Sequence, residues 1–304
     1  MRIGFAVPVA GPYATPENQL EIAVRAEQLG YESLWTMQRV LNPVDSPDTS
    51  YRNVPDPLIT LAYLAGHTTR ARLGVAVWNA PFAAPALLAQ QAATLDRLSH
   101  GRLDLGLGLG WLAEELTAFG VPTARRGARL EEFLTVLRQL WTDRTERFDG
   151  EFYQLPDALV SPTPVQQPRP PILLGGGADA ALRRVGRLAD GWISASRHDP
   201  HDLHRSISVI KEAAERAGRD PESLRFICRA ALGSPMHGPD SPLSGSHDRI
   251  RAGVAWLGEQ GITEVFYDPN FDPTVVGPDV PPEVAVAKVT ELLDGLAPGS
   301  ALRL

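Results

Sequence analysis

Residues 95–111 read LDRLSHGRLDLGLGLGW, and residues 171–184 read PILLGGGADAALRR. Each stretch is an apolar, strand-like run that stops in glycines and then restarts as a helix. Glycine lets the backbone approach a ligand closely, and the N–H groups that open the next helix form an anion site. One such element is a weak signal. Two of them on a strand–helix alternation predict a phosphate-bearing cofactor over the strand ends of an α/β barrel.

Composition narrows the class of protein. The 304 residues are 43% hydrophobic and carry a formal net charge of −7, which predicts a globular core and argues against a nucleic-acid surface. Cys228 is the single cysteine, so no intrachain disulfide forms, and its strand-like surroundings predict a buried, inert thiol. The chain shows neither a secretory signal nor an apolar run long enough to span a bilayer, so we expect a cytoplasmic enzyme.

The spacing of apolar residues predicts eight strands that alternate with helices. This alternation favours an α/β fold, a single-domain (β/α)8 TIM barrel over residues 1–304, rather than a doubly wound sheet. Residues 37–56, 143–171 and 233–246 are expected as inserted loops, the second holding a hairpin with an Asp-Gly turn at 148–153. The strands are expected at 3–9, 32–36, 72–78, 103–108, 172–175, 191–195, 224–232 and 263–267, and the helices at 17–29, 57–67, 84–98, 127–141, 178–188, 201–217, 246–260 and 282–296.

Four segments carry a resemblance to a known family. They are GYESLW at 30–35, QAATLDRLSHGR at 91–102, GLGLGW at 106–111 and GRLADGW at 186–192. Together they resemble the luciferase-like monooxygenase superfamily of flavin and deazaflavin oxidoreductases over nearly the whole chain. Residues 122–141 resemble the branch that binds coenzyme F-420, although users of FMN share many of these residues.

The resemblance implies a cofactor site. A strand bulge with a non-prolyl cis peptide maps to Ala76-Val77, beneath the flat ring, and Asn79 faces the ring edge or tail. The cofactor phosphate is expected on backbone N–H groups at the start of the fifth barrel helix, because an acidic side chain contacts phosphate poorly. The residues implied for the phosphate are Gly176, Gly177, Ala178 and Asp179, and those implied for the substrate side are Gly108, Gly110, Trp111 and Glu114.

One departure from the family affects proton transfer. Many relatives place a histidine where this chain has Arg39, whose pKa is too high for acid–base catalysis near neutral pH. Arg39 can still hold an anionic substrate group or stabilise charge on a reduced cofactor. Arg197 and His198 follow the sixth barrel strand, where relatives contact substrate, and His198 is the leading candidate for proton transfer.

Several of the candidate residues can also be explained by a purely structural role. The glycines at 106–110 can simply permit tight packing, and Trp35, Trp78 and Trp111 are equally core residues or walls around a cofactor. His198, His201 and His204 have metal-like spacing but lack carboxylate or cysteine partners, so no metal site is predicted. A basic patch is expected to be paired to neighbouring helices, and a glycosidase pair at Glu114 and Glu115 lacks support elsewhere. The patch consists of Arg125, Arg126 and Arg129.

Three functions follow, in order of preference. The first is an F-420-dependent oxidoreductase that transfers a hydride to or from a small organic substrate. The second is a two-component monooxygenase that uses reduced FMN from a separate reductase. The third is a cofactor-binding homologue without catalysis, suggested by Arg39. By resemblance the protein is expected to form a homodimer.

Overall fold

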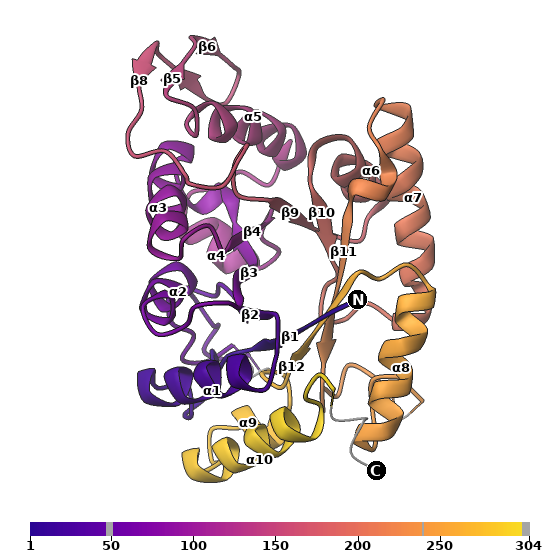
Figure 1. Ribbon diagram of the computed structural model, residues 1–304. Coiled ribbons are helices and arrows are strands. Elements are labelled where there is room, and N and C mark those ends of the chain that lie inside the picture. Colours follow the sequence, from indigo (N-terminus) through magenta and orange to yellow (C-terminus); the bar gives the residue numbers. More distant parts are fainter. Residues whose placement is uncertain (47–50, 239, 300–304) are drawn as a thin grey trace.

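Eight parallel strands close into a barrel in the computed structural model, which describes residues 1–46, 51–238 and 240–299. The strands follow the order β1, β12, β11, β10, β9, β4, β3, β2 around the barrel, and helices surround it (Figure 1). The predicted (β/α)8 barrel is therefore confirmed. Its strands are β1 (Arg2–Ala6), β2 (Ser33–Thr36), β3 (Arg72–Asn79), β4 (Leu103–Gly108), β9 (Ile172–Gly175), β10 (Gly191–Ile193), β11 (Arg225–Ala231) and β12 (Glu264–Asp268).

The predicted helices are all present. Two further short helices, α4 (Ala113–Ala118) and α9 (Pro273–Val276), were not predicted, since each is less than two turns long. None of the helices in the described part of the chain is long and apolar enough to cross a membrane. The predicted helices are α1 (Pro16–Gln28), α2 (Pro57–Ala65), α3 (Pro85–Leu98), α5 (Arg126–Gln139), α6 (Asp179–Leu188), α7 (Leu203–Arg216), α8 (His247–Glu259) and α10 (Pro282–Gly295).

The insertion at 143–171 forms two small antiparallel ladders above α5 (Figure 1). They pair β5 (Arg144–Thr145) with β8 (Ala158–Leu159), and β6 (Phe148–Asp149) with β7 (Gln154–Leu155). The predicted hairpin is present, but its turn is not the Asp-Gly pair, because Asp149 is already paired with Gln154 in the ladder. The loop is residues 150–153. The insertions at 37–56 and 233–246 include residues 47–50 and 239, which lie outside the described part of the chain.

Aromatic and aliphatic side chains fill the middle of the barrel. The indole of Trp35 stacks on the ring of Phe266, with the centroids 4.9 Å apart. Gly74 makes room for this indole, because a Cβ atom there would lie 2.3 Å from Trp35 Cε3. Trp35 is thus a core residue rather than a cofactor wall. Ala6, Ala76, Leu173, Ile193 and Ile227 complete this inner cluster.

Cys228 is buried in β11, where it packs in the outer core between strands and helices. Burial raises the pKa of its thiol to about 12, so the thiolate does not form near neutral pH. The predicted inert, buried cysteine is confirmed.

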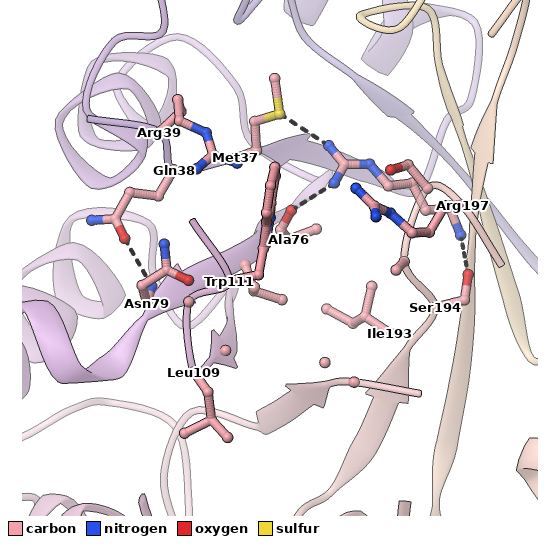
Figure 2. Close-up of a pocket in the computed structure, with 18 of the residues that line it drawn as sticks. Met37, Gln38, Arg39, Ala76, Asn79, Leu109, Trp111, Ile193, Ser194 and Arg197 are labelled. Carbon is pink, nitrogen blue, oxygen red and sulfur yellow. Dashed lines mark hydrogen bonds between the residues drawn. The ribbon is translucent and has the colours of Figure 1, made fainter. Parts of the chain in front are cut away.

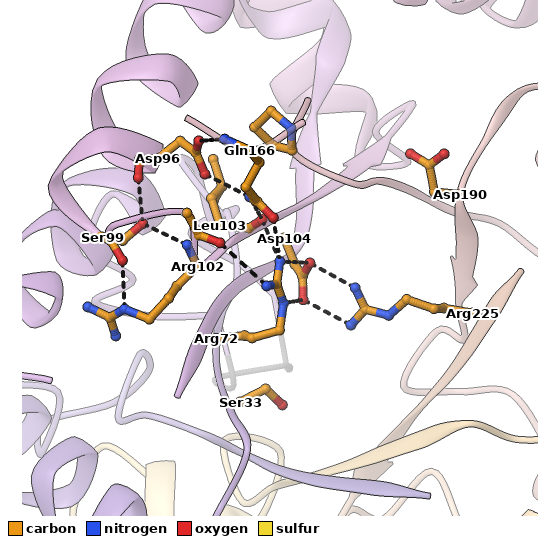
Figure 3. A network of polar contacts seen from close by, with 12 residues as sticks. Ser33, Arg72, Asp96, Ser99, Arg102, Leu103, Asp104, Gln166, Asp190 and Arg225 are labelled. Atoms are coloured by element: carbon orange, nitrogen blue, oxygen red, sulfur yellow. Dashed lines mark hydrogen bonds and ion pairs between the residues drawn. The ribbon is translucent and has the colours of Figure 1, made fainter. Parts of the chain in front are cut away.

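Charged side chains close the amino-terminal end of the barrel (Figure 3). The fully buried carboxylate of Asp104 accepts hydrogen bonds from Arg72, at 2.6 and 2.9 Å, and from Arg225, at 2.8 and 2.9 Å. Arg225 also donates to Glu264 at 2.8 Å, and the Ser33 hydroxyl donates to the same carboxylate at 2.7 Å. Burial alone would raise the pKa of Asp104, but the two guanidinium groups outweigh it and hold that pKa below its ordinary value.

Asp104→Asn should lower the free energy of unfolding by about 3–5 kcal/mol, because Arg72 and Arg225 then lose their shared buried counter-charge. Urea unfolding at pH 7 measures the loss. The difference from wild type should narrow as the pH falls below about 4, since the contribution of a carboxylate with a lowered pKa is lost on protonation. Asp294→Asn, which breaks an exposed pair with Arg25, is the control and should cost less than about 1 kcal/mol. Equal losses in the two variants would contradict this account.

Candidate functional site

A cavity of about 380 Å³ opens at the carboxyl-terminal face of the barrel, where β3, β4, β9 and β10 end (Figure 2). This is the face on which barrel enzymes place their active sites, and the volume is that of a small-molecule pocket. Figure 2 shows Gln38 and Asn79 on one side of the cavity and Ser194 and Arg197 on the other. The predicted site residues that line it are Arg39, Ala76, Val77, Asn79, Gly108, Gly110, Trp111 and Gly176.

The wall from β3 contains the irregularity that the resemblance implied. The peptide bond between Ala76 and Val77 is cis, and the register against β4 shifts between Val75 and Trp78. Ala76 and Val77 both line the cavity. The predicted non-prolyl cis peptide is therefore confirmed. The bulge interrupts the ladder with β4 at Ala76 and Val77, which line the cavity, and the ladder resumes at Trp78.

Arg229 at the end of β11 secures the same wall. Its Nε donates to Asp268 at 2.7 Å, one terminal nitrogen donates to the Ala76 carbonyl at 3.0 Å, and the other contacts Met37 Sδ at 3.3 Å. Sequence reasoning missed Arg229. The available signal was an arginine inside the apolar strand 225–231, which indicates a buried partner such as the acidic residue that ends the next strand.

Gly108 and Asn79 complete the edge between β3 and β4. A Cβ atom on Gly108 would lie 2.6 Å from Val77 Cγ2 and 3.4 Å from Asn79 Oδ1, so a larger residue would displace the bulge. The Asn79 N–H donates to Gln38 Oε1 at 2.8 Å, which connects this edge to the segment after β2.

Arg39 is a buried, paired cation. Its guanidinium donates to Glu115 at 2.6 Å, and the fully buried Glu115 also accepts from the N–H groups of Val40 and Leu41, at 2.7 and 3.2 Å. The pair therefore fastens the segment after β2 to α4. Glu114, the carboxylate predicted on the substrate side, is exposed and is not among the residues that line the cavity. The neighbouring Glu115 faces inward in its place.

Trp111 covers the mouth of the cavity between two guanidinium groups. Arg39 Cζ lies 4.6 Å from the indole centroid, and Arg197 Cζ lies 5.2 Å from it. Arg39 also stacks on Tyr51, at 4.3 Å. Of the three candidate tryptophan walls, Trp111 lines the cavity, whereas Trp35 and Trp78 are buried in the core.

The second glycine cluster, residues 175–177, connects the cavity to the start of α6. Gly176 has φ +132°, and its carbonyl accepts from Trp192 Nε1 at 2.8 Å. The N-cap residue Ala178 makes no side-chain cap hydrogen bond, so the helix opens with N–H groups that can meet an anion. The carboxylate of Asp179 turns to Arg205, at 2.9 Å, and to Arg183, at 3.7 Å.

His198 lies beside this helix start and is not among the residues that line the cavity. Its Nδ1 accepts from the Ala195 N–H at 2.9 Å, which leaves the proton of the neutral ring on Nε2. Nε2 faces Gly177, where a Cβ atom would lie 2.3 Å away. Burial lowers the pKa of His198, although Asp202 opposes the shift. The structure thus places His198 at the phosphate end of the predicted site, and its role in proton transfer stays a prediction.

The three arginines of the predicted basic patch differ. Arg125 pairs with Glu151 of the inserted hairpin. Arg126 donates to the Gly110 carbonyl at 2.8 Å, and Arg129 stacks on Phe152 at 5.0 Å. Neither Arg126 nor Arg129 has a carboxylate within ion-pair distance in the described residues, and the partner of Arg125 is not on a helix. The expected pairing to neighbouring helices is therefore wrong for all three. Across residues 1–46, 51–238 and 240–299, no group of three histidine, cysteine or acidic residues can hold a metal ion.

Glu115→Gln should lower the free energy of unfolding by about 3–5 kcal/mol, because it leaves the buried Arg39 without a counter-charge. Chemical unfolding followed by circular dichroism measures the change. Glu114→Gln makes the same chemical change one residue earlier on an exposed side chain and should stay within about 0.5 kcal/mol of wild type. A Glu115→Gln protein as stable as this control would show that the buried pair contributes little.

Comparisons with known proteins agree with the geometry. An uncharacterized protein of Mycobacterium tuberculosis is 34% identical over 278 residues, which are 86% of this chain and 88% of that protein. An F-420-dependent glucose-6-phosphate dehydrogenase of Kineococcus radiotolerans is 35% identical over 210 residues, 67% of this chain and 60% of that enzyme.

A solved structure and a family model extend the agreement. The monooxygenase RslO1 from Streptomyces bottropensis superposes with a TM-score of 0.76 at 22% identity, covering 97% of this chain and 98% of that one, which shows a shared fold. The family model described as luciferase-like monooxygenase matches residues 1–233. The chain belongs to the luciferase-like monooxygenase family, as the sequence resemblance predicted, and is an oxidoreductase enzyme.

Proposed function

We propose that this enzyme binds coenzyme F-420 and transfers a hydride between the deazaflavin ring and a small organic substrate. One observation carries the proposal: a single cavity joins the cis-peptide bulge at Ala76-Val77 to the glycines that open α6. A ligand with a flat ring and a phosphate can contact both ends at once. The relative from Kineococcus radiotolerans, whose name gives F-420 as its cofactor, supports this choice.

The residues present fit such a cofactor. Gly108 and Gly176 both line the cavity, and without side chains they leave their backbone open to a ligand. Close packing also requires them to be glycine, since added Cβ atoms would lie within 3 Å of Val77 and Ala181. Ala178 leaves the first N–H groups of α6 without a side-chain acceptor, as an anion site requires. The uncapped helix start favours a phosphate at this end.

The protein's contribution is orientation and electrostatics. Ala76, Val77 and Asn79 would hold the ring against β3, and Gly176, Gly177 and Ala178 would hold the phosphate. The deazaflavin, when bound, supplies hydride transfer, so the reaction does not require a histidine at position 39. Arg39 fastens the segment after β2 and holds Trp111 over the mouth, which limits access of water.

Titration of the purified protein with oxidised F-420 and, separately, with FMN tests the proposal through cofactor fluorescence. Micromolar binding of F-420 with much weaker binding of FMN is expected. Preferential binding of FMN, with oxygen consumption that depends on added reduced FMN, would instead support the two-component monooxygenase and its separate reductase. Tight F-420 binding without reduction by a broad screen of alcohols, aldehydes and sugar phosphates would favour the non-catalytic homologue.

Gly177→Ala should weaken F-420 binding by about tenfold or more, the equivalent of one lost charge-assisted hydrogen bond. The added methyl would lie 2.3 Å from His198 Nε2 and would displace the imidazole ring of His198 from the start of α6. The fluorescence titration reports the loss. Gly258→Ala in α8 is the matched control, because its methyl would meet only Met1, at 3.4 Å, and F-420 affinity should be unchanged. Unaltered affinity in Gly177→Ala would place the phosphate elsewhere.

We also propose that two copies pair through α2 and α3. These adjacent helices expose large apolar side chains, including Ile59 at 72%, Leu87 at 50% and Leu98 at 54%. Apolar side chains gathered on one face favour burial against a partner.

Ile59→Glu should convert a dimer into monomers, because it places a charge in the apolar contact. Sedimentation velocity of the variant and of wild type measures the change. Val284→Glu on α10, where Val284 is 52% exposed, is the control and should leave the dimer intact. A monomeric wild-type protein would overturn the pairing.

A further inference from the structure

The charged side chains that line the cavity are all arginines: Arg39, Arg197 and Arg229. Among the described lining residues there is no aspartate or glutamate. Arg39 is neutralised by Glu115 at 2.6 Å, and Arg229 by Asp268 at 2.7 Å. Within the described part of the chain, Arg197 has no carboxylate at ion-pair distance, so the cavity carries one positive charge without a counter-charge.

The two paired arginines are each held by a carboxylate inside the protein. Arg229 uses its three nitrogens on Asp268, the Ala76 carbonyl and Met37. Arg39 donates to Glu115 through one terminal nitrogen, and its side chain is only 5% exposed; within the described residues its buried Nε has no hydrogen-bond partner. These two guanidiniums maintain the shape of the site.

Arg197 is held differently. Its guanidinium lies over the face of Trp111, at 5.2 Å from the ring centroid, and Arg39 supports the same indole at 4.6 Å. A cation–π contact positions the guanidinium without a carboxylate partner, so that its N–H groups remain able to donate to an anion. Trp111 is 57% exposed and Arg197 is also exposed, so both lie where a substrate enters. Figure 2 shows Arg197 beside Ser194, on the side of the cavity away from Gln38 and Asn79.

We propose that Arg197 recognises an oxyanion, a carboxylate or phosphate monoester, on the organic substrate of this enzyme. The inference rests on the proposed function, in which the cofactor occupies the wall from β3 and the substrate lies toward β10. The remaining walls near Arg197 include the apolar Ile193 and Ala195, which suit the body of such a molecule. The guanidinium can donate two parallel hydrogen bonds to the two oxygens of an oxyanion. A neutral amide has one oxygen and no charge, so it cannot accept both bonds.

Binding of benzoate, phenyl phosphate and the neutral benzamide tests this inference. Isothermal titration calorimetry is run at constant ionic strength on the protein with and without F-420, beside the F-420 titration itself. Either anion should bind at least about tenfold more tightly than benzamide, as expected for a charged hydrogen bond. Arg197→Gln should abolish this preference and Arg197→Lys should restore part of it. The control Arg216→Gln, an exposed arginine on α7, should bind as wild type does.

Each outcome separates the two proposals. Equal binding of anions and benzamide, no binding of any probe, or a preference that survives Arg197→Gln would overturn the role of Arg197. If F-420 binds but the anions show no preference, this inference alone falls. If F-420 does not bind but the preference is present and depends on Arg197, the cofactor assignment falls instead. A tenfold loss of F-420 affinity in Arg197→Gln would assign Arg197 to the cofactor and overturn the inference.

Discussion

Trp35 fills the middle of the barrel, and the size of its indole constrains the residues on neighbouring strands. Its indole stacks on Phe266 and occupies the space that a side chain at Gly74 would fill. A parallel barrel must fill its interior with side chains from every strand, so one large ring forces small residues on the strand beside it. Below this layer the interior is sealed by ion pairs, and above it the strand ends enclose a cavity.

Three buried carboxylates, Asp104, Asp268 and Glu115, are each held by a partner on another element or segment. Asp104 joins β4 to β3 and β11, Asp268 joins β12 to β11, and Glu115 joins α4 to the segment after β2. Such pairs add little net stability over apolar packing, but they impose a single arrangement because a misplaced partner leaves a charge unpaired. The cavity therefore has rigid walls, while the exposed Arg197 and Trp111 stand at its mouth.

Sequence patterns located the barrel and eight of the residues that line the cavity, and the reason is local. A strand that ends in glycines and restarts as a helix is recorded in consecutive residues, so β4, β9 and the start of α6 were predicted directly. Thr15 and Asp56 cap their helices, and Gly30 and Gly261 adopt φ of +92° and +95°; these features depend on neighbouring residues alone. The assignments to Glu114 and His198 depended instead on where a short helix begins and how a loop turns.

The sequence by itself determined the alternation of strands and helices, the glycines that end β4 and β9, and the family, because periodicity and short motifs lie in contiguous residues. Only the tertiary structure decided which carboxylate of the pair at 114–115 faces inward, since one residue along α4 rotates a side chain by about 100°. Only the tertiary structure also brought Arg229 to the Ala76 carbonyl, 153 residues away, and placed Trp111 between Arg39 and Arg197. Those contacts arise from barrel closure, which brings distant strand ends together at one face.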